Sequence, residues 1–467
     1  LKVSNKSGGR TSGSVTKPAR GRFPKGVLSG ALNGCLGAER DVHVIHLVAG
    51  AAGMYCGSCL HDNRLVATLR AQGRDVLLVP LYTPLRTDEQ DVSERRLYYG
   101  GLNVYLQQNS VLFRHTPRFL DRLLDARVLL RALGRLAGRT RAEELGALTV
   151  SVLEGPAGAQ RKELARLIAG LRRLEPRLVH LPNLMFVGVA RTLKAALNVP
   201  VVCGLAGEDI FLDDLPEPHR QRAFDLIRTG AADVDAFDAP TAYYARHAAE
   251  QFGLPPERIH HIPMGIRVED FAAADPPRAP FTIGYLARVC PAKGLLNLAR
   301  ALVKLHAAGR DVRVRAAGYL GPADRSYLER VREELRAFGV PGDVFEYVGE
   351  VTRAEKIAFL RTLHVLSVPT EYVESKGFYV LESLAAGVPV VQPAHGSFPE
   401  LLAATGGGLL YDPRSPETLA GTLARLMDDE PQRRRLAEQG RAAVQASFTA
   451  DRAADAMWRL YERLAPR

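Results

Sequence analysis

The stretch LHVLSVPTEYVESKGFYVLESLAAGVPVVQ (residues 363–392) decides the fold of this chain. It begins and ends with short apolar runs, LHVLSV (363–368) and VPVVQ (388–392), which are typical of strands buried in a parallel sheet. Residues 378–386 between them have a helical pattern. A strand, a helix and a second strand in this order predict a βαβ unit.

The same alternation of strand and helix runs along most of the chain. Further strands are expected at 43–48, 75–79, 177–181, 199–203, 281–286, 312–317 and 344–349. Helical patterns are found at 60–72, 160–174, 186–197, 294–308, 323–338 and 354–361, and the last stretch, 415–464, reads as helical throughout. A segment rich in Pro and small residues, 263–280, divides the series in two. The pattern predicts an α/β protein with two doubly wound Rossmann-like domains that face each other across a cleft.

The length of 467 residues also favours two domains, because single hydrophobic cores stop growing near ~250–300 residues. We expect an N-terminal Rossmann-like domain over 41–272 and a C-terminal one over 273–445. A final helix, 446–467, is expected to return toward the first domain. Residues 1–40 lack the apolar content to fold and are predicted to be a disordered basic tail.

The net charge of +11 is concentrated in that tail. Residues 1–40 hold eight Lys or Arg against Glu39 alone, a net of +7, so the rest of the chain carries only +4. A nucleic-acid-binding protein is therefore the least favoured functional class. Five cysteines are too few and too scattered for a disulfide framework, which predicts a cytoplasmic protein. There is also no run of ~18 apolar residues that would predict a membrane span.

The strongest signal for chemistry is a pair of glutamates in the quoted stretch. Glu374 and Glu382 stand eight residues apart, and Gly377 comes just before the helix that carries Glu382. A helix N-terminus presents free N–H groups to a phosphate or a sugar oxygen. Glu382 can accept two hydrogen bonds from a diol such as a ribose, and Glu374 can do the same for sugar hydroxyls.

Two cations form the second signal. Arg288 and Lys293, in GYLARVCPAKGL (284–295), follow a predicted strand and are placed to neutralise a diphosphate. Negative charge builds on a diphosphate as a sugar leaves it, so fixed cations there lower the barrier. Taken alone, the two would be ordinary surface cations.

At this point the chain resembles a known family. E-x7-E followed by AAGVPVV, R-x4-K-G after a strand, PMGI (263–266) and HLPN (180–183) are similar to the motifs of the retaining glycosyltransferase family 4, the group 1 glycosyltransferases. The resemblance implies the GT-B fold, transfer with retention of configuration, and no metal or other cofactor. Its donor would be a nucleotide diphosphate sugar, for which we favour a UDP-hexose.

The resemblance also assigns roles to residues of this sequence. Glu374 would hold the donor sugar, Glu382 the ribose, and Arg288 and Lys293 the diphosphate. The backbone of Gly377 and Phe378 would touch the sugar or the phosphate.

The chain departs from the family at one place. Many members have a His near the end of the fourth strand of the first domain, where this chain has Ala206 in CGLAGEDIFLDD (203–214). Glu208 and Asp209 follow it and are the candidates to orient the acceptor hydroxyl. They could equally be the acids that commonly occupy a helix N-terminus.

The loop after the first strand, VAGAAGMYCGSC (48–59), is rich in glycine, and its Gly53 is expected to lie against the donor. Cys56 and Cys59 form a CxxC motif at the start of a helix. An inert or acceptor-lining role is favoured over a redox pair or half of a zinc site, since no second Cys/His cluster completes such a site.

Other readings stay open. The basic amphipathic stretch 117–136 is expected to pack on its domain, and peripheral contact with the inner face of a membrane is the alternative. The favoured function is hexosyl transfer to an unidentified hydroxyl acceptor. Another GT-B enzyme, such as a sugar-nucleotide epimerase or a phosphorylase, is the alternative.

Overall fold

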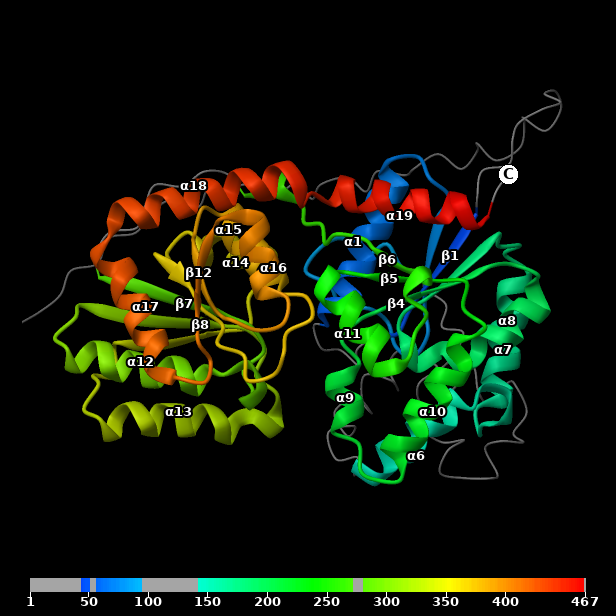
Figure 1. Cartoon of the computed structure of the whole chain (residues 1–467), viewed down its shortest axis with the longest axis horizontal. Coiled ribbons are helices and arrows are strands. Elements are labelled where there is room, and N and C mark those ends of the chain that lie inside the picture. Colours follow the sequence, from blue (N-terminus) through cyan, green and yellow to red (C-terminus); the bar gives the residue numbers. More distant parts are fainter. Residues whose placement is uncertain (1–42, 51–55, 95–141, 272–279, 466–467) are drawn as a thin grey trace, which may run out of the picture. The chain divides into compact units, whose positions relative to one another are not determined.

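A computed structural model describes residues 43–50, 56–94, 142–271 and 280–465. The predicted tail over 1–40, Gly53 and the amphipathic stretch 117–136 lie outside the described residues. The described part of the chain contains two separate β-sheets, each of six strands, with helices on their faces (Figure 1).

The first sheet is wholly parallel, in the spatial order β2-β1-β3-β4-β5-β6. Its strands are β1 (Val44–Val48), β2 (Val76–Pro80), β3 (Leu178–Leu181), β4 (Val201–Gly204), β5 (Ala236–Ala239) and β6 (Ile259–His261). Every residue of β1, β3, β4 and β5 is buried. This burial explains why the first three of these read as continuous apolar runs, as strands covered on both faces do.

The second sheet is also parallel, in the order β12-β11-β10-β7-β8-β9. Its strands are β7 (Phe281–Leu286), β8 (Val312–Ala317), β9 (Phe345–Gly349), β10 (Val365–Leu366), β11 (Val390–Pro393) and β12 (Gly408–Tyr411). From β7 the chain adds strands on one side and then, from β10, on the other. The neighbours β7 and β10 therefore mark the point where the strand order reverses.

Helices connect the strands of both sheets. Around the first sheet these are α1 (Gly57–Ala71), α6 (Ala142–Leu153), α7 (Arg161–Arg172), α8 (Ala190–Leu197), α9 (Asp209–Asp213), α10 (His219–Ala231) and α11 (Ala242–Phe252). Around the second they are α12 (Leu295–Ala307), α13 (Arg325–Ala337), α14 (Arg353–Leu360), α15 (Phe378–Ala385), α16 (Phe398–Thr405) and α17 (Pro416–Asp428). The helices α18 (Glu430–Ser447) and α19 (Ala450–Leu464) complete the chain.

The last helix belongs to the first sheet's core although it ends the sequence. α19 packs against α1 (Figure 1), and its Met457 and Tyr461 are fully buried there. The chain enters α19 beside the segment that leaves β6. There, Ile266 N donates to Phe448 O and Ala450 N donates to Ile266 O, both at 2.9 Å. The N-terminal domain is therefore built from two separate parts of the sequence.

The predicted fold class, α/β with two doubly wound sheets, is confirmed, but two details differ. The stretch 415–464 is helical over almost its whole length, as predicted, but side-chain caps divide it into α17, α18 and α19. Asp429 accepts from Gln432 N at 2.8 Å to start α18, and Thr449 accepts from Arg452 N at 3.3 Å to start α19. The sequence also missed the strands β5, β6 and β12.

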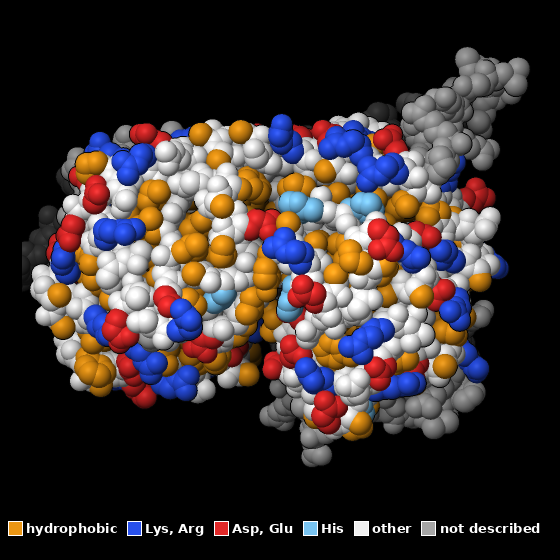
Figure 2. Space-filling model, viewed as in Figure 1, with side chains coloured by type: hydrophobic (Ala, Val, Ile, Leu, Met, Phe, Trp, Pro, Cys, Tyr) orange, Lys and Arg blue, Asp and Glu red, His pale blue; other side chains and the backbone are white. Residues whose placement is uncertain are grey.

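Charges of both signs mix on the surface. On the face shown in Figure 2, Lys and Arg side chains alternate with Asp and Glu over the described residues, and no single basic patch gathers there. None of the helices in the described ranges combines the length and the apolar character that crossing a bilayer requires.

Candidate active site

Two loops meet where the strand order of the second sheet reverses. Arg288 and Lys293 follow β7, and Glu374 and Gly377 follow β10. Gly294 allows the loops to close on each other, because it has a φ of +71° and a Cβ there would lie 1.8 Å from the carbonyl oxygen of Pro369. Ligands of open parallel sheets bind at this position, beyond the carboxyl ends of the strands.

Glu374 is held by three side chains. Lys293 Nζ lies 2.7 Å from Glu374 Oε2, and the hydroxyls of Tyr372 and Tyr379 donate to the same oxygen at 2.8 and 3.1 Å. Lys293 also contacts the Tyr372 hydroxyl and lies 4.7 Å from the centre of its ring. Burial opposes ionisation of Glu374, but Lys293 and these hydrogen bonds outweigh it and hold its pKa below the ordinary value. The site therefore contains a buried, ionised carboxylate in a fixed position.

Arg288 is in the opposite situation. It is exposed, and no carboxylate in the described ranges forms an ion pair with it. Its backbone is fixed, since the Tyr285 hydroxyl donates to the Arg288 carbonyl oxygen at 2.9 Å. An exposed guanidinium on a fixed backbone, with no ion pair among the described residues, is suited to bind an anionic ligand.

Helix α15 begins at the same loop. Gly377 is its N-cap residue, with a φ of +81°, and Phe378 is its first residue. No side chain caps this N-terminus, so its N–H groups stay open to an acceptor. Ser397 N donates to Glu374 O at 2.8 Å and holds the loop in place from the start of α16.

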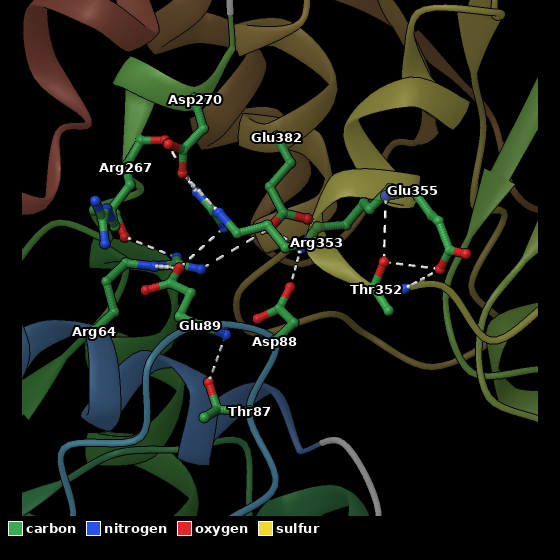
Figure 3. Close-up of polar contacts among 12 residues, drawn as sticks. Arg64, Thr87, Asp88, Glu89, Arg267, Asp270, Thr352, Arg353, Glu355 and Glu382 are labelled. Atoms are coloured by element: carbon green, nitrogen blue, oxygen red, sulfur yellow. Dashed lines mark hydrogen bonds and ion pairs between the residues drawn. The ribbon is translucent and has the colours of Figure 1, made fainter. Parts of the chain in front are cut away.

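Glu382, one turn into α15, joins a buried network of charges that Figure 3 shows. Lys356 Nζ lies 2.7 Å from Glu382 Oε1 and 2.8 Å from Asp88 Oδ2. Burial alone would lower the pKa of Lys356, but the two carboxylates raise it, so the ammonium stays charged. Glu382 Oε1 is therefore occupied, while Oε2 has no hydrogen-bond partner among the described residues.

The network continues across both domains. Glu89 Oε1 accepts from Arg64 Nε at 2.7 Å and from Arg353 NH1 at 3.0 Å (Figure 3). Arg353 Nε also donates to Asp270 Oδ2 at 2.7 Å, and Arg64 NH2 lies 4.0 Å from Glu382 Oε1. α1 and the loop after β2 are thus tied to α14 and α15 by charges that are almost fully buried.

Hydrogen bonds from the backbone and a hydroxyl tie the domains at a second place. The Thr241 hydroxyl, at the start of α11, donates to Ser375 O at 3.1 Å. The backbone N–H groups of Ala242 and Tyr243 donate to the carboxylate of Glu400 at 2.9 and 2.7 Å. Since Ser375 neighbours Glu374, these bonds fix the loop after β10 against the first sheet's loops.

One face of α1 also meets this loop. Ser58, His61 and Arg64 are spaced by three residues and so share a face. Lys376 Nζ donates to Ser58 Oγ at 2.7 Å. The His61 ring centre lies 5.4 Å from that of Phe378, and the Arg64 guanidinium carbon lies 5.9 Å from it.

Glu208 and Asp209, the acidic pair after β4, form hydrogen bonds with neighbouring loops and with Tyr244. Glu208 accepts from the N–H groups of Leu184 and Ala206, both at 2.8 Å, and the Tyr244 hydroxyl lies 3.1 Å from Oε2. The same hydroxyl donates to Asp209 Oδ1 at 2.7 Å. Burial raises the pKa of Glu208 above its ordinary value. These bonds position the ends of β3 and β4, and acceptor orientation by this pair stays a prediction.

The two cysteines of the CxxC motif are free thiols. A hydrogen bond from Cys59 lowers the pKa of Cys56 to about 6, whereas that bond and burial raise the pKa of Cys59. No group of three or more His, Cys, Asp and Glu side chains in the described ranges is arranged to hold a metal ion.

The predicted residues Arg288, Lys293, Glu374, Gly377 and Phe378 thus lie on the loops after β7 and β10 and at the start of α15, and Glu382 lies one turn into that helix. The sequence missed Tyr372 and Tyr379, although they flank Glu374 in the decisive stretch. It also missed Arg64 and Lys356, for which no local pattern exists, because they come from distant elements.

Two family models match adjoining parts of the chain. The model described as Glycosyl transferases group 1 matches residues 267–443, and the model described as Glycosyltransferase Family 4 matches residues 136–270. These ranges cover the second sheet and most of the first.

Individual proteins agree with this match. A D-inositol 3-phosphate glycosyltransferase from Acidothermus cellulolyticus is 26% identical over 360 residues, which cover 70% of this chain and 78% of the relative. A GDP-mannose-dependent monoacylated alpha-(1-6)-phosphatidylinositol monomannoside mannosyltransferase from Corynebacterium glutamicum is 24% identical over 279 residues, or 56% of this chain and 69% of the relative.

Among solved structures, the Anabaena protein HepE in complex with UDP superimposes with a TM-score of 0.65 at 16% identity, covering 91% of this chain and 100% of that one. That likeness establishes the fold. Together with the two family matches, it shows that the chain belongs to the group 1 glycosyltransferases of the GT-B fold and is a glycosyltransferase.

Proposed function

We propose that this enzyme transfers a hexose from a UDP-sugar to a hydroxyl acceptor, with retention of configuration and without a metal ion. The observation that carries the proposal is the pair of loops after β7 and β10. They carry an exposed guanidinium that forms no ion pair with the described residues, a buried ionised carboxylate and a helix N-terminus without a side-chain cap. The guanidinium and the helix N-terminus can bind a diphosphate. The carboxylate can accept hydrogen bonds from sugar hydroxyls.

The residues divide the donor between them. Arg288 and the N-terminus of α15 bind the diphosphate. Lys293 lies beside the diphosphate and also forms the ion pair with Glu374. Glu374 accepts hydrogen bonds from the hexose hydroxyls, and Glu382 Oε2 accepts them from the ribose. UDP is favoured because HepE, which shares the fold, binds it; the corynebacterial relative, which depends on GDP-mannose, makes GDP the alternative base.

In the proposed reaction the acceptor oxygen bonds to the anomeric carbon as the bond from that carbon to the diphosphate breaks. The acceptor proton passes to an oxygen of the leaving diphosphate. Positive charge from Arg288 and the helix N-terminus stabilises the negative charge that builds there. The acceptor is proposed to be a polyol phosphate, because the Acidothermus relative acts on an inositol 3-phosphate.

A panel of UDP-glucose, UDP-N-acetylglucosamine and GDP-mannose tests this proposal. Each is measured for thermal stabilisation and for release of nucleoside diphosphate, with water or inositol 3-phosphate as acceptor. A bound donor at 100 times its Kd stabilises the fold by about 2.7 kcal/mol. A failure of every nucleotide sugar to stabilise the protein or to turn over would contradict the proposal.

Turnover is expected to persist in excess EDTA, since protein cations supply the charge that a metal gives other transferases. The measurement compares the rate before and after chelation, and then after Mg²⁺ or Mn²⁺ is added. A rate that falls to background with EDTA and returns with either ion would contradict metal independence.

Glu382→Gln is expected to raise the Kd for UDP by about tenfold or more, because a hydrogen bond to a charged group contributes ~1.5–3 kcal/mol. Calorimetric titration with UDP measures it. Glu333→Gln, an exposed glutamate on α13, is the matched control and should leave the Kd unchanged. Equal affinities of the two variants for UDP would show that Glu382 does not bind the ribose.

A further inference from the structure

One histidine of the first domain, His61, meets the loop after β10 and forms no hydrogen bond or ion pair with any residue that the structure describes. His61 lies on the face of α1 that meets the loop after β10, between Ser58 and Arg64. Its ring is partly buried and lies 5.4 Å from the ring of Phe378, the first residue of α15. The imidazole is therefore next to the helix N-terminus at which the donor's phosphate and sugar are proposed to bind.

The two buried histidines of the first sheet form hydrogen bonds with a neighbouring side chain, and His61 forms none with the described residues. His180 Nδ1 lies 2.7 Å from the Tyr461 hydroxyl, and His46 Nδ1 lies 3.3 Å from it. No described residue forms a hydrogen bond or an ion pair with either ring nitrogen of His61. Burying part of a ring without such bonds costs free energy, because its nitrogens lose contact with water. A ligand that forms a hydrogen bond with the ring offsets this cost.

The surroundings of His61 keep its ring neutral. Burial, together with the cations Lys376 and Arg64, lowers the pKa of His61 to about 4, although Asp62 and Asp238 act in the opposite direction. The bond from Lys376 Nζ to Ser58 Oγ holds that cation close to the ring. A neutral imidazole has one nitrogen that accepts a hydrogen bond and one that donates.

We propose that His61 is a catalytic residue that binds the acceptor hydroxyl and orients it toward the anomeric carbon. It would thereby supply from α1 the imidazole that this chain lacks at Ala206. The inference rests on the proposed function and deepens it. The accepting nitrogen receives the hydrogen bond of the hydroxyl and aligns the oxygen's lone pair for attack. The proton still ends on the leaving diphosphate, so His61 changes no net charge in the reaction.

Two variants and a control test the role of His61. His61→Ala is expected to lower turnover of the best donor by about 100-fold, while the Kd for UDP changes less than about twofold. Imidazole added to the buffer should restore part of the lost rate, because its ring nitrogen can accept the hydrogen bond that His61 no longer accepts. His61→Gln, which keeps a hydrogen-bonding side chain of similar length, guards against a packing defect and should retain more activity than alanine. The control is His43→Ala. In the wild type, His43 Nδ1 lies 2.7 Å from Asp75 Oδ2 at an exposed position.

The outcomes separate the possible failures. Turnover of His61→Ala within about threefold of the wild type would overturn the catalytic role. Loss of turnover together with loss of UDP affinity, without rescue by imidazole, would also overturn it and would make His61 a packing partner of Phe378. Absence of turnover in the wild-type enzyme with every donor would instead overturn the proposed function, and this inference with it.

Discussion

Replacing Arg288 with alanine is expected to lower kcat for sugar transfer by about 100- to 1000-fold, the cost of removing one preorganised group that stabilises developing negative charge. The fold should be unaffected, because Arg288 is exposed and has no carboxylate partner in the described ranges. Steady-state kinetics with the best donor measure the loss, and the Kd for UDP should rise as well.

Arg336→Ala is the matched control for this change, since Arg336 is also an exposed arginine of the second domain, at the end of α13. Arg288→Lys should recover part of the rate, because it keeps the charge without the planar fork of donors. If Arg288→Ala turns over as fast as Arg336→Ala, the diphosphate does not bind at the loop after β7.

Replacing Lys356 with methionine is expected to destabilise the protein by about 3–5 kcal/mol, because it leaves two buried carboxylates without their shared cation. The side chains of Lys356, Asp88 and Glu382 are only 10%, 7% and 9% exposed. Urea unfolding of the wild type and the variant measures the difference in free energy.

Lys304→Met is the control for this loss, because the ion pair of Lys304 with Glu417 is largely exposed and should contribute at most ~1 kcal/mol. Adding Asp88→Asn and Glu382→Gln to Lys356→Met should recover stability, since no unpaired charge then remains buried. A Lys356→Met variant as stable as Lys304→Met would show that the ion pairs of Lys356 with Asp88 and Glu382, part of the network of Figure 3, do not stabilise the fold.

The strands and the donor loops could be predicted because their signals are local. Strands such as β7 are continuous apolar runs, and Glu374 and Gly377 lie within one stretch with a recognisable order of residues. The strands β5 (AFDA) and β6 (IHH) gave no such run. β5 is buried but carries Asp238, which lies 2.9 Å from His180, and β6 is at the edge of its sheet.

The contacts of the site could not be predicted, because they join residues that are far apart in the sequence. Glu382 was read as free to bind a ribose, yet one of its oxygens is held by Lys356 from another helix. Glu208 was read as facing an acceptor, yet two backbone N–H groups occupy its carboxylate. In both cases a carboxylate's availability depends on which cations and N–H groups the fold brings beside it.

The place of α19 in the core of the first sheet has a consequence for the synthesis of the protein. β1 and α1 leave the ribosome well before the helix that covers them. Residues 262–449 separate β6 from α19 and take on the order of 10–40 s to translate. During that time the N-terminal domain exposes apolar side chains that Met457 and Tyr461 later bury. The chain's single tryptophan, Trp458, lies in the same helix, 5.2 Å from the Arg74 guanidinium carbon, so its fluorescence reports the moment at which the nascent domain closes.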